Sequence, residues 1–154
     1  MPNIDVHFSS ETNEWETPEE LFSLLNNFFK FNLDAASTDE NAKCERHFTI
    51  EDDGLSQDWG GNTVWLNPPY GRELGKWVKK SYEESKKPNT TVVILIPART
   101  DTSYWHNYVM KASDIFYIKG RLKFLNKEKG SKNSAPFPSA IVVFGGWKKW
   151  LTSF

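Results

Sequence analysis

The sequence predicts an α/β fold in which helices cover both faces of a mostly parallel sheet. Residues 91–96 are a continuous run, Thr-Val-Val-Ile-Leu-Ile, which is typical of a strand buried on both faces. Residues 73–85 place apolar side chains on one face of a helix and lysines on the opposite face. Because strand and helix patterns alternate along the chain, we expect residues 1–154 to form one domain around such a sheet.

The first third of the chain is predicted to hold one amphipathic helix and two short strands. Residues 1–14 are polar and are expected to form a flexible arm. Thr17 and Pro18 predict a helix start, with Thr17 as the N-cap, and the helix is expected to end near Lys30. Its expected apolar face consists of Leu21, Leu24, Leu25 and Phe28. The expected strands are residues 31–34 and residues 45–50.

The rest of the chain is predicted to contribute further strands and a second, shorter helix. Asp101 and Thr102 are expected to cap a helix that runs through Met110. Residues 126–133 are rich in charge and are expected to form a loop. The remaining strand candidates are residues 63–66, 115–118, 121–124 and 140–144.

The composition argues against several classes of protein. With Cys44 as its one cysteine, the chain cannot form an internal disulfide, which suits a reducing cytoplasm. One cysteine and three scattered histidines give no zinc-ligand spacing, so no metal is expected. No apolar stretch approaches the length that spans a membrane, and the first residues lack a signal-peptide pattern. We therefore expect a cytoplasmic protein without a membrane partner.

Charge is divided unevenly along the chain. Residues 1–66 hold 3 Lys or Arg against 14 Asp or Glu, whereas residues 67–154 hold 16 against 6. A basic part of this kind is typical of proteins that bind a polyanion such as nucleic acid. The alternative is that the two parts neutralise each other in the fold, and the sequence leaves both open.

The tetrapeptide Asn67-Pro68-Pro69-Tyr70, directly after residues 63–66, carries the strongest chemical signal. Proline has a fixed φ and no N–H, so the turn is stiff and its carbonyl groups stay free to accept hydrogen bonds. The Asn67 side-chain oxygen and the Pro68 carbonyl would form an acceptor pair beside an aromatic ring, which suits a planar amino group. In open α/β sheets, ligands bind at the carboxyl ends of strands, where this turn is expected. The alternative is a rigid strand-to-helix turn with an incidental asparagine.

Further motifs extend this signal over nearly the whole chain. In order, they are Trp15-Glu16-Thr17-Pro18, Leu33-Asp34-Ala35-Ala36-Ser37, Asp53-Gly54-Leu55-Ser56-Gln57-Asp58-Trp59 and the Asn-Pro-Pro-Tyr turn. This order resembles that of the phage-type DNA N6-adenine methyltransferases. The resemblance implies a Rossmann-like S-adenosylmethionine-dependent methyltransferase fold, S-adenosyl-L-methionine as cofactor and an adenine amino group in double-stranded DNA as acceptor. The chain departs from the family at residues 35–37, where related enzymes usually carry a glycine-rich turn.

The resemblance also implies where the cofactor binds. Asp34 would hold the methionine ammonium group, unless it only caps the following turn. Thr17 and the amides after Pro18 would bind the methionine carboxylate, unless they form an ordinary capping box. Asp58 would contact the adenine of the cofactor, unless it is a solvated loop acid. The other expected cofactor-binding residues are Trp15, Ala35, Ala36 and Asn67, and the candidates for the ribose are Glu45 and Asp52.

For catalysis, the resemblance implies that Asn67 and Pro68 accept the two N–H bonds of the adenine amino group in the turn stiffened by Pro69. The adenine must leave the duplex, and Tyr70 and Phe137 would cover its two faces unless these rings belong to the core. The expected phosphate contacts are Arg99, Arg121, Lys123, Lys127, Lys129 and Lys132. We expect a monomer or weak homodimer in a bacterial or phage-infected host cytoplasm.

Two other functions are weighed against this one. The same tetrapeptide serves methyltransferases that act on a glutamine side chain or an RNA base, although the motif order argues against them. The second alternative is a catalytically silent module that binds DNA or cofactor, and the intact turn from Asn67 to Tyr70 argues against it.

Overall fold

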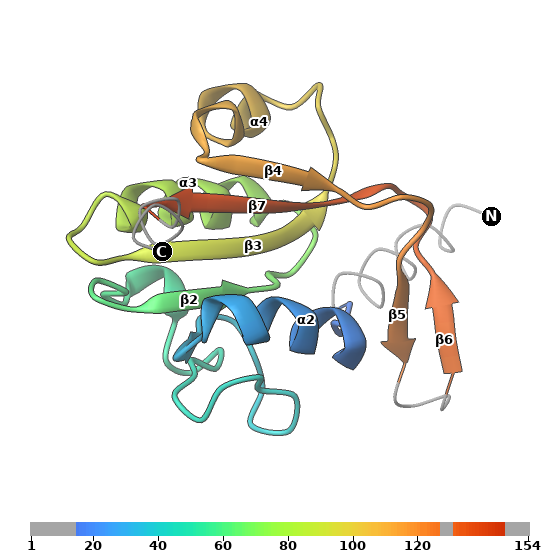
Figure 1. Cartoon of the computed structure of the whole chain (residues 1–154), viewed down its shortest axis with the longest axis horizontal. Helices are drawn as coiled ribbons and strands as arrows, with labels where there is room; N and C mark the ends of the chain where they lie inside the picture. The colour runs from blue at the N-terminus through green and yellow to red at the C-terminus, as the bar shows by residue number, and fades with distance from the viewer. Residues whose placement is uncertain (1–14, 127–130, 147–154) are drawn as a thin grey trace.

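A five-stranded sheet forms the centre of the molecule (Figure 1). The computed structural model describes residues 15–126 and 131–146, so the expected arm of residues 1–14 lies outside the described residues. The strands, in the order in which they lie side by side, are β1 (Leu33–Asp34), β2 (Thr63–Leu66), β3 (Thr91–Pro97), β7 (Ser139–Gly145) and β4 (Asp114–Tyr117).

The sheet is mixed rather than mostly parallel. β1, β2 and β3 run parallel, with Asp34 opposite Trp65 and Trp65 opposite Val93. β7 runs antiparallel to both of its neighbours, β3 and β4. The physical reason is the route of the chain, because it leaves β4 through a hairpin and returns as β7 between β3 and β4. The expectation of a mostly parallel sheet is therefore not confirmed.

Helices lie on both faces of this sheet, and Figure 1 shows α2 in front of it and α3 behind it. Tyr82 of α3 meets Phe144 of β7 with 6.2 Å between ring centroids, and Phe22 of α2 meets Trp65 of β2 at 5.5 Å. The helices are α2 (Glu19–Phe29), α3 (Leu74–Ser85) and α4 (Ser103–Asn107), with the 3-10 helices η1 (Gly54–Ser56) and η2 (Val109–Lys111). Within the described ranges, none of them is long and apolar enough to cross a membrane.

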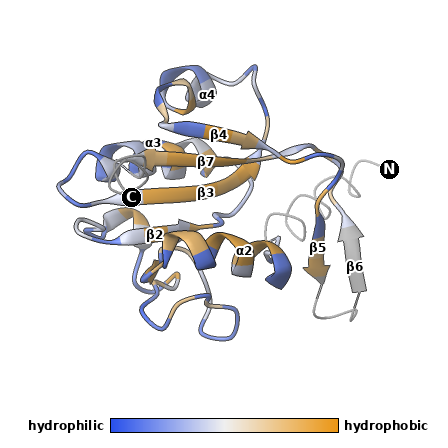
Figure 2. Cartoon of the chain, viewed as in Figure 1, coloured by the Kyte–Doolittle hydropathy of each residue, from blue (hydrophilic) through white to orange (hydrophobic). Residues whose placement is uncertain are grey.

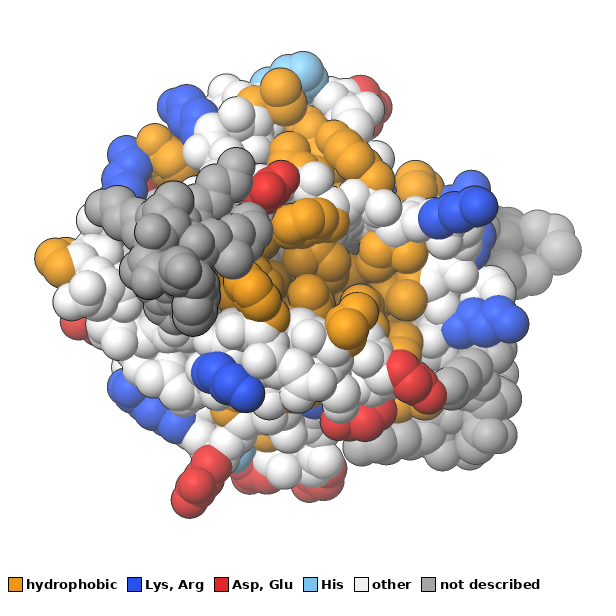
Figure 3. Space-filling view, viewed as in Figure 1, with side chains coloured by type: hydrophobic (Ala, Val, Ile, Leu, Met, Phe, Trp, Pro, Cys, Tyr) orange, Lys and Arg blue, Asp and Glu red, His pale blue; other side chains and the backbone are white. Residues whose placement is uncertain are grey.

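The core follows the two long central strands. Every residue of β3 is buried, which confirms the prediction from residues 91–96, and β7 is buried from Ser139 to Phe144. Both strands are hydrophobic along most of their length (Figure 2). Hydrophobic side chains also gather in the middle of the face shown in Figure 3. Phe116 of β4 belongs to the face of the sheet that carries Trp65 and is 45% exposed.

Helix α2 turns only part of its predicted apolar face to the sheet, and Leu21 and Leu25 of that face pack against the core. Phe22 and Phe29 are buried, whereas Leu24 and Phe28 of the predicted apolar face are 69% and 44% exposed. Contacts between aromatic rings decide the orientation, because Phe22 packs edge-on against Trp65.

The start of α2 also differs from the prediction. The helix begins at Glu19, and Pro18 occupies the N-cap position without any side-chain capping bond. The first helical hydrogen bond runs from the Phe22 amide to the Pro18 carbonyl, at 3.1 Å. Thr17 is therefore not the N-cap, and its hydroxyl is available for another partner.

Two further predictions are corrected in the middle of the chain. Residues 45–50 form no strand, and one isolated bridge joins His47 to Asp34. Thr102 caps α4 as predicted, because its hydroxyl accepts a hydrogen bond from the Trp105 amide at 3.3 Å. The helix expected to run through Met110 is interrupted, so that α4 and η2 share its length.

A two-stranded hairpin leaves the sheet between β4 and β7 (Figure 1). It consists of β5 (Lys123–Asn126) and β6 (Ser131–Ser134), so a strand occupies part of the predicted loop 126–133. Pro97, the last residue of β3, pairs with Ser139, the first residue of β7, and the hairpin leaves the sheet at this edge, which is formed by strand ends. Since β1 and β2 run parallel to β3, this is also the edge at which they end.

Candidate active site

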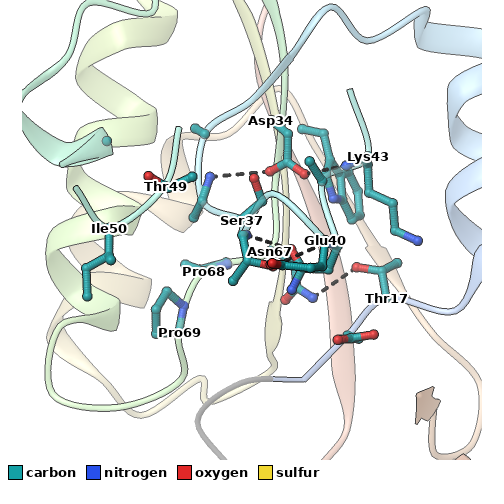
Figure 4. Close-up of a pocket in the computed structure, with 18 of the residues that line it drawn as sticks. Thr17, Asp34, Ser37, Glu40, Lys43, Thr49, Ile50, Asn67, Pro68 and Pro69 are labelled. Carbon is teal, nitrogen blue, oxygen red and sulfur yellow. Dashed lines mark hydrogen bonds between the residues drawn. The ribbon is translucent and has the colours of Figure 1, made fainter. Parts of the chain in front are cut away.

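A cavity of about 770 Å³ opens where β1 and β2 end (Figure 4). It has the size of a small-molecule site. Its walls are the segment before α2, the loop after β1, the loop before η1 and the turn after β2. This position, beyond the carboxyl ends of parallel strands, is the one that the sequence predicts.

Asp34 lies at the end of β1 and lines the cavity while only 2% exposed. Its carboxylate accepts hydrogen bonds from the backbone amides of Lys43, at 2.9 Å, and Ala36, at 3.3 Å. Burial raises the pKa of Asp34 to about 6, although these two amides and the charges of His47 and Lys43 act in the opposite direction. Asp34 therefore holds the loop after β1 and keeps a buried carboxyl group beside the cavity.

Asn67 follows β2 directly, and its side-chain amide reaches back to the segment before α2 (Figure 4). Nδ2 donates to the backbone carbonyl of Trp15 and to the Thr17 hydroxyl oxygen, the latter at 2.9 Å. Oδ1 is buried and has no hydrogen-bond partner among the described residues. Leaving a buried acceptor unpaired costs about 1–3 kcal/mol. The hydroxyl groups of Tyr104 and Ser139 are also buried without a partner among the described residues, but of these three residues Asn67 is the one that lines the cavity.

Gly54 brings the loop before η1 against the loop after β1. A Cβ at this position would stand 2.3 Å from the Ala35 backbone oxygen, so only glycine permits the approach. The Trp59 indole N–H donates to the Gly54 carbonyl at 2.9 Å, and the Trp59 ring stacks on Trp77 at 6.3 Å. The Asp-Gly motif thus shapes one wall of the cavity, and Trp59 anchors it.

The cavity wall is strongly acidic. Among the described lining residues, Lys43 is the one basic side chain. The acidic lining residues are Glu16, Glu19, Asp34, Asp39, Glu40, Glu51 and Asp53. Lys43 is itself paired with Glu19 at 2.8 Å. The acidic part of the sequence therefore gathers around this cavity, which favours a cationic ligand. No three side chains in the described part of the chain come together as a metal site.

Many of the residues predicted for the site meet here. The lining residues that the sequence predicts are Trp15, Thr17, Asp34, Ala35, Ala36, Asn67, Pro68 and Pro69. Pro18 is buried beside them without lining the cavity. The lining residues that sequence reasoning missed include Ser37, Glu40, Lys43, Thr49, Ile50, Asp53 and Gly54. Ser37 and the Asp53-Gly54 pair were usable signals, because they belong to two of the recognised motifs, whereas the others lie in loops without a pattern.

Asp58 lies elsewhere. Its carboxylate is exposed and pairs with Lys87 at 2.7 Å, and it does not line the cavity. The physical reason is its place before the amino end of β2, whereas the cavity lies beyond the opposite end. The ribose candidates do not line it either, since Glu45 belongs to a separate shallow pocket and Asp52 accepts from the Thr49 amide at 2.8 Å.

Tyr70 and Phe137 belong to an aromatic cluster beside the cavity. Tyr70 is 4% exposed, and its hydroxyl donates to the Leu95 carbonyl at 2.9 Å. Burial raises the pKa of Tyr70 well above its usual value. The rings of Phe137 and Phe124 meet it edge-on at 5.6 and 6.2 Å, and Trp15 joins both phenylalanines. Neither Tyr70 nor Phe137 lines the cavity, so the structure holds them as packed rings rather than as free stacking faces.

The predicted phosphate contacts lie near the same edge of the sheet. Arg99 follows β3, and its guanidinium lies 6.0 Å from the Phe137 ring centre. Arg121 and Lys123 are exposed before and at the start of β5. Lys127 and Lys129 lie outside the described residues, and Lys132 lies on β6.

The fold is similar to that of a solved protein of distant sequence. The X-ray structure of precorrin 8w decarboxylase from Methanobacterium thermoautotrophicum matches with a TM-score of 0.51 at 10% identity, covering 88% of this chain and 95% of that one. A likeness at this level of identity concerns the fold alone.

Curated proteins with higher identity cover most of the chain. A DNA N-6-adenine-methyltransferase of Haemophilus phage HP1 is 32% identical over 139 residues, which are 88% of this chain and 80% of the phage protein. One of Escherichia phage T1 is 34% identical over 75% of this chain, which spans 55% of that relative. A putative methyltransferase of Escherichia coli, YfdM, is 37% identical over 46% of this chain. Because the model of the DNA N-6-adenine-methyltransferase (Dam) family matches residues 7–154, the chain belongs to that family.

Proposed function

We propose that this DNA N6-adenine methyltransferase uses the cavity beyond β1 and β2 to transfer a methyl group from S-adenosyl-L-methionine to an adenine flipped out of double-stranded DNA. The observation that carries this proposal is the buried, unpaired Oδ1 of Asn67. It is a hydrogen-bond acceptor without a donor, and the amino group of adenine is a donor. Because Oδ1 is buried in the free protein, the neighbouring atoms of the cavity wall must move for the two to meet. Oδ1 lies on a cavity residue at the edge of the sheet where ligands bind in such folds.

The residues present fit the cofactor. A cationic methionine ammonium group suits Asp34, whose carboxylate is already oriented by two backbone amides. The other acidic lining residues favour a ligand with net positive charge, and 770 Å³ accommodates a ligand of this size. When bound, S-adenosyl-L-methionine supplies an electrophilic methyl group on a sulfonium centre.

Asn67 contributes by accepting a hydrogen bond from the adenine amino group. The nitrogen is a poor nucleophile while its lone pair is delocalised into the ring, and an N–H bond directed at Oδ1 favours the pyramidal form. A carbon–nitrogen bond forms as the sulfur–carbon bond breaks, with its electron pair remaining on sulfur. Asn67 stabilises the positive charge that develops on nitrogen, and the surplus proton leaves to water. The Pro68 carbonyl is the proposed second acceptor.

The DNA is proposed to lie over the edge that carries Arg99, Arg121 and Lys123. These cations are exposed and stand apart from the acidic cavity, so the two charge types serve different ligands. An adenine must leave the duplex to reach Asn67. Stacking of that base on Tyr70 requires the surrounding rings to move, because Tyr70 is packed in the free protein.

The test is methyl transfer from labelled S-adenosyl-L-methionine to adenine-containing DNA. We expect the purified protein to label DNA and Asn67→Ala to lose at least about 100-fold in rate, as for the loss of a group that stabilises transition-state charge. Asn107→Ala, on the exposed end of α4, is the matched control and should retain full activity. Labelling of RNA or protein with DNA unlabelled would contradict the proposed acceptor.

A further inference from the structure

The side-chain amide of Asn67 is fixed in one of its two orientations. The Trp15 backbone carbonyl can only accept, so Nδ2 and not Oδ1 must face it. The second Nδ2 hydrogen is taken by the Thr17 hydroxyl oxygen at 2.9 Å. If the amide were turned over, Oδ1 would face the Trp15 carbonyl oxygen, and two acceptors would repel each other. Nδ2 would then take the position from which the proposed function requires an acceptor for the adenine amino group. Residues 15–17 therefore determine that Asn67 offers an oxygen to its remaining neighbour.

The buried Thr17 side chain contacts Asn67, which lies far from it in the sequence. It is 2% exposed, although it lies outside α2 and does not cap the helix. Its hydroxyl oxygen accepts from Asn67 Nδ2 at 2.9 Å, and Thr17 forms part of the cavity wall. A threonine in this place serves the turn after β2 rather than the helix that follows it.

The segment that holds Asn67 is itself held by the β5–β6 hairpin. The Leu125 amide donates to the Glu16 carbonyl at 3.1 Å, which forms an isolated antiparallel bridge. The Trp15 ring meets Phe124 of β5 at 5.2 Å. Phe124 in turn meets Tyr70 of the Asn-Pro-Pro-Tyr turn at 6.2 Å. Residues 15–17 are thus fixed on one side by the hairpin and hold Asn67 on the other.

We propose that residues Trp15–Thr17 form a positioning strap for Asn67, in which Thr17 orients the amide and β5 holds the strap in place. This proposal rests on the proposed catalytic role of Asn67. Thr17 acts through Asn67 rather than on the cofactor, which differs from the carboxylate-binding role that the resemblance implies. The hairpin contributes to methyl transfer in the same indirect way, through the Glu16–Leu125 bridge.

The first experiment compares Thr17→Val with Thr17→Ser. Valine keeps the shape and removes the acceptor, whereas serine keeps the acceptor. We expect Thr17→Val to lower kcat for DNA methylation about 10- to 100-fold with the Kd for S-adenosyl-L-methionine within about twofold of the wild type, and Thr17→Ser to stay within about threefold in kcat. Thr17→Ala is a second variant without the acceptor and should show the same loss. Unaltered thermal unfolding shows that the variants are folded.

Three outcomes would overturn the strap. A wild-type kcat in Thr17→Val would show that Asn67 needs no such partner. Equal losses in Thr17→Val and Thr17→Ser would assign the effect to shape rather than to the acceptor. A weaker cofactor Kd with unchanged kcat would make Thr17 a cofactor ligand. Failure of the proposed function looks different, because then Asn67→Ala itself would keep wild-type activity.

The second experiment tests the hairpin with Leu125→Pro. Since the Leu125 N–H points to Glu16, proline removes this bond without removing a donor from the β5–β6 pairing. Because the Leu125 side chain also lines the cavity, Leu125→Ala, which keeps the N–H, is the control. We expect Leu125→Pro to lower kcat at saturating DNA and saturating cofactor by more than Leu125→Ala does. A fall in DNA affinity alone, with kcat unchanged, would show that the hairpin does not act through the strap.

Discussion

The Asp34 carboxylate accepts a hydrogen bond from the backbone amide of Lys43, with 2.9 Å between Oδ2 and the nitrogen. This contact closes the loop after β1 and leaves the carboxyl group 2% exposed beside the cavity. Burial raises its pKa to about 6, which places its titration near neutral pH. The proposed cofactor site therefore contains a pH-sensitive group.

The affinity for S-adenosyl-L-methionine should depend on pH through Asp34. An ammonium group binds the ionised carboxylate, which becomes protonated as the pH falls through about 6. We expect the affinity to be constant above that pH and to fall by up to about tenfold for each unit below it. Asp34→Asn should bind the cofactor weakly and lose this dependence. Calorimetry between pH 5 and pH 8 measures both effects.

His47 supplies the control for this prediction, because its charge also faces Asp34. The hydrogen bonds to the Asp39 carboxylate and to the Glu45 carbonyl raise the pKa of His47 above its usual value. His47→Gln should keep the fall in affinity below pH 6. If Asp34→Asn retained the slope and His47→Gln lost it, the dependence would belong to the histidine.

Asp53 and Asp58 form a matched pair that tests the position of the cofactor. Asp53 lines the cavity, whereas Asp58 lies before the amino end of β2 and pairs with Lys87. We expect Asp53→Asn to weaken S-adenosyl-L-methionine binding about twofold to fivefold, and Asp58→Asn to leave the Kd unchanged. Asparagine tolerates the positive φ of 54° at residue 53, so backbone strain does not confuse the comparison. The reverse order of effects would move the cofactor to the Asp58 side.

Gly54 should tolerate no side chain. A Cβ would stand 2.3 Å from the Ala35 oxygen, so Gly54→Ala must push apart two loops of the cavity wall. We expect a loss of about 1–3 kcal/mol in the free energy of unfolding, together with weaker cofactor binding. Gly75→Ala in α3 is the control, because its Cβ would lie 3.4 Å from the Tyr104 ring and a helix gains up to about 1 kcal/mol from alanine. Urea unfolding gives both values, and equal stability of the two variants would contradict the close approach.

The strands at the centre could be predicted because their side-chain patterns are local. Residues 63–66 and 91–96 became β2 and β3 almost without change, since burial on both faces leaves an uninterrupted apolar run. The antiparallel insertion of β7 could not be predicted in the same way. Its neighbours β3 and β4 are set by pairing between distant parts of the chain, which no local pattern records.

The site was predictable where a motif carries the chemistry and not where long-range contacts assign a residue. Asn67 directly follows β2 and Asp34 is the last residue of β1, and both strands were recognised, so the positions of the two residues followed from the fold. Thr17 has the sequence of a helix cap, yet its hydroxyl meets Asn67, 50 residues later. The Thr17 hydroxyl could either cap the helix or contact Asn67. It contacts Asn67, because Pro18 occupies the N-cap position of α2.

DNA binding should depend on the basic edge of the sheet, with Arg99, Arg121 and Lys123 as the residues to neutralise. Each phosphate contact that is lost should weaken DNA binding and reduce the slope of log K against log salt by about 0.9. Because these side chains lie away from the acidic cavity, the affinity for S-adenosyl-L-methionine should stay unchanged. Lys86→Gln, at the end of α3 that faces the amino ends of the strands, is the control and should keep the wild-type slope. If the variant with all three residues neutralised kept the wild-type slope of log K against log salt, the DNA would bind on another face. A smaller slope together with full affinity for S-adenosyl-L-methionine would show that DNA and cofactor bind to separate surfaces, as the charge distribution predicts.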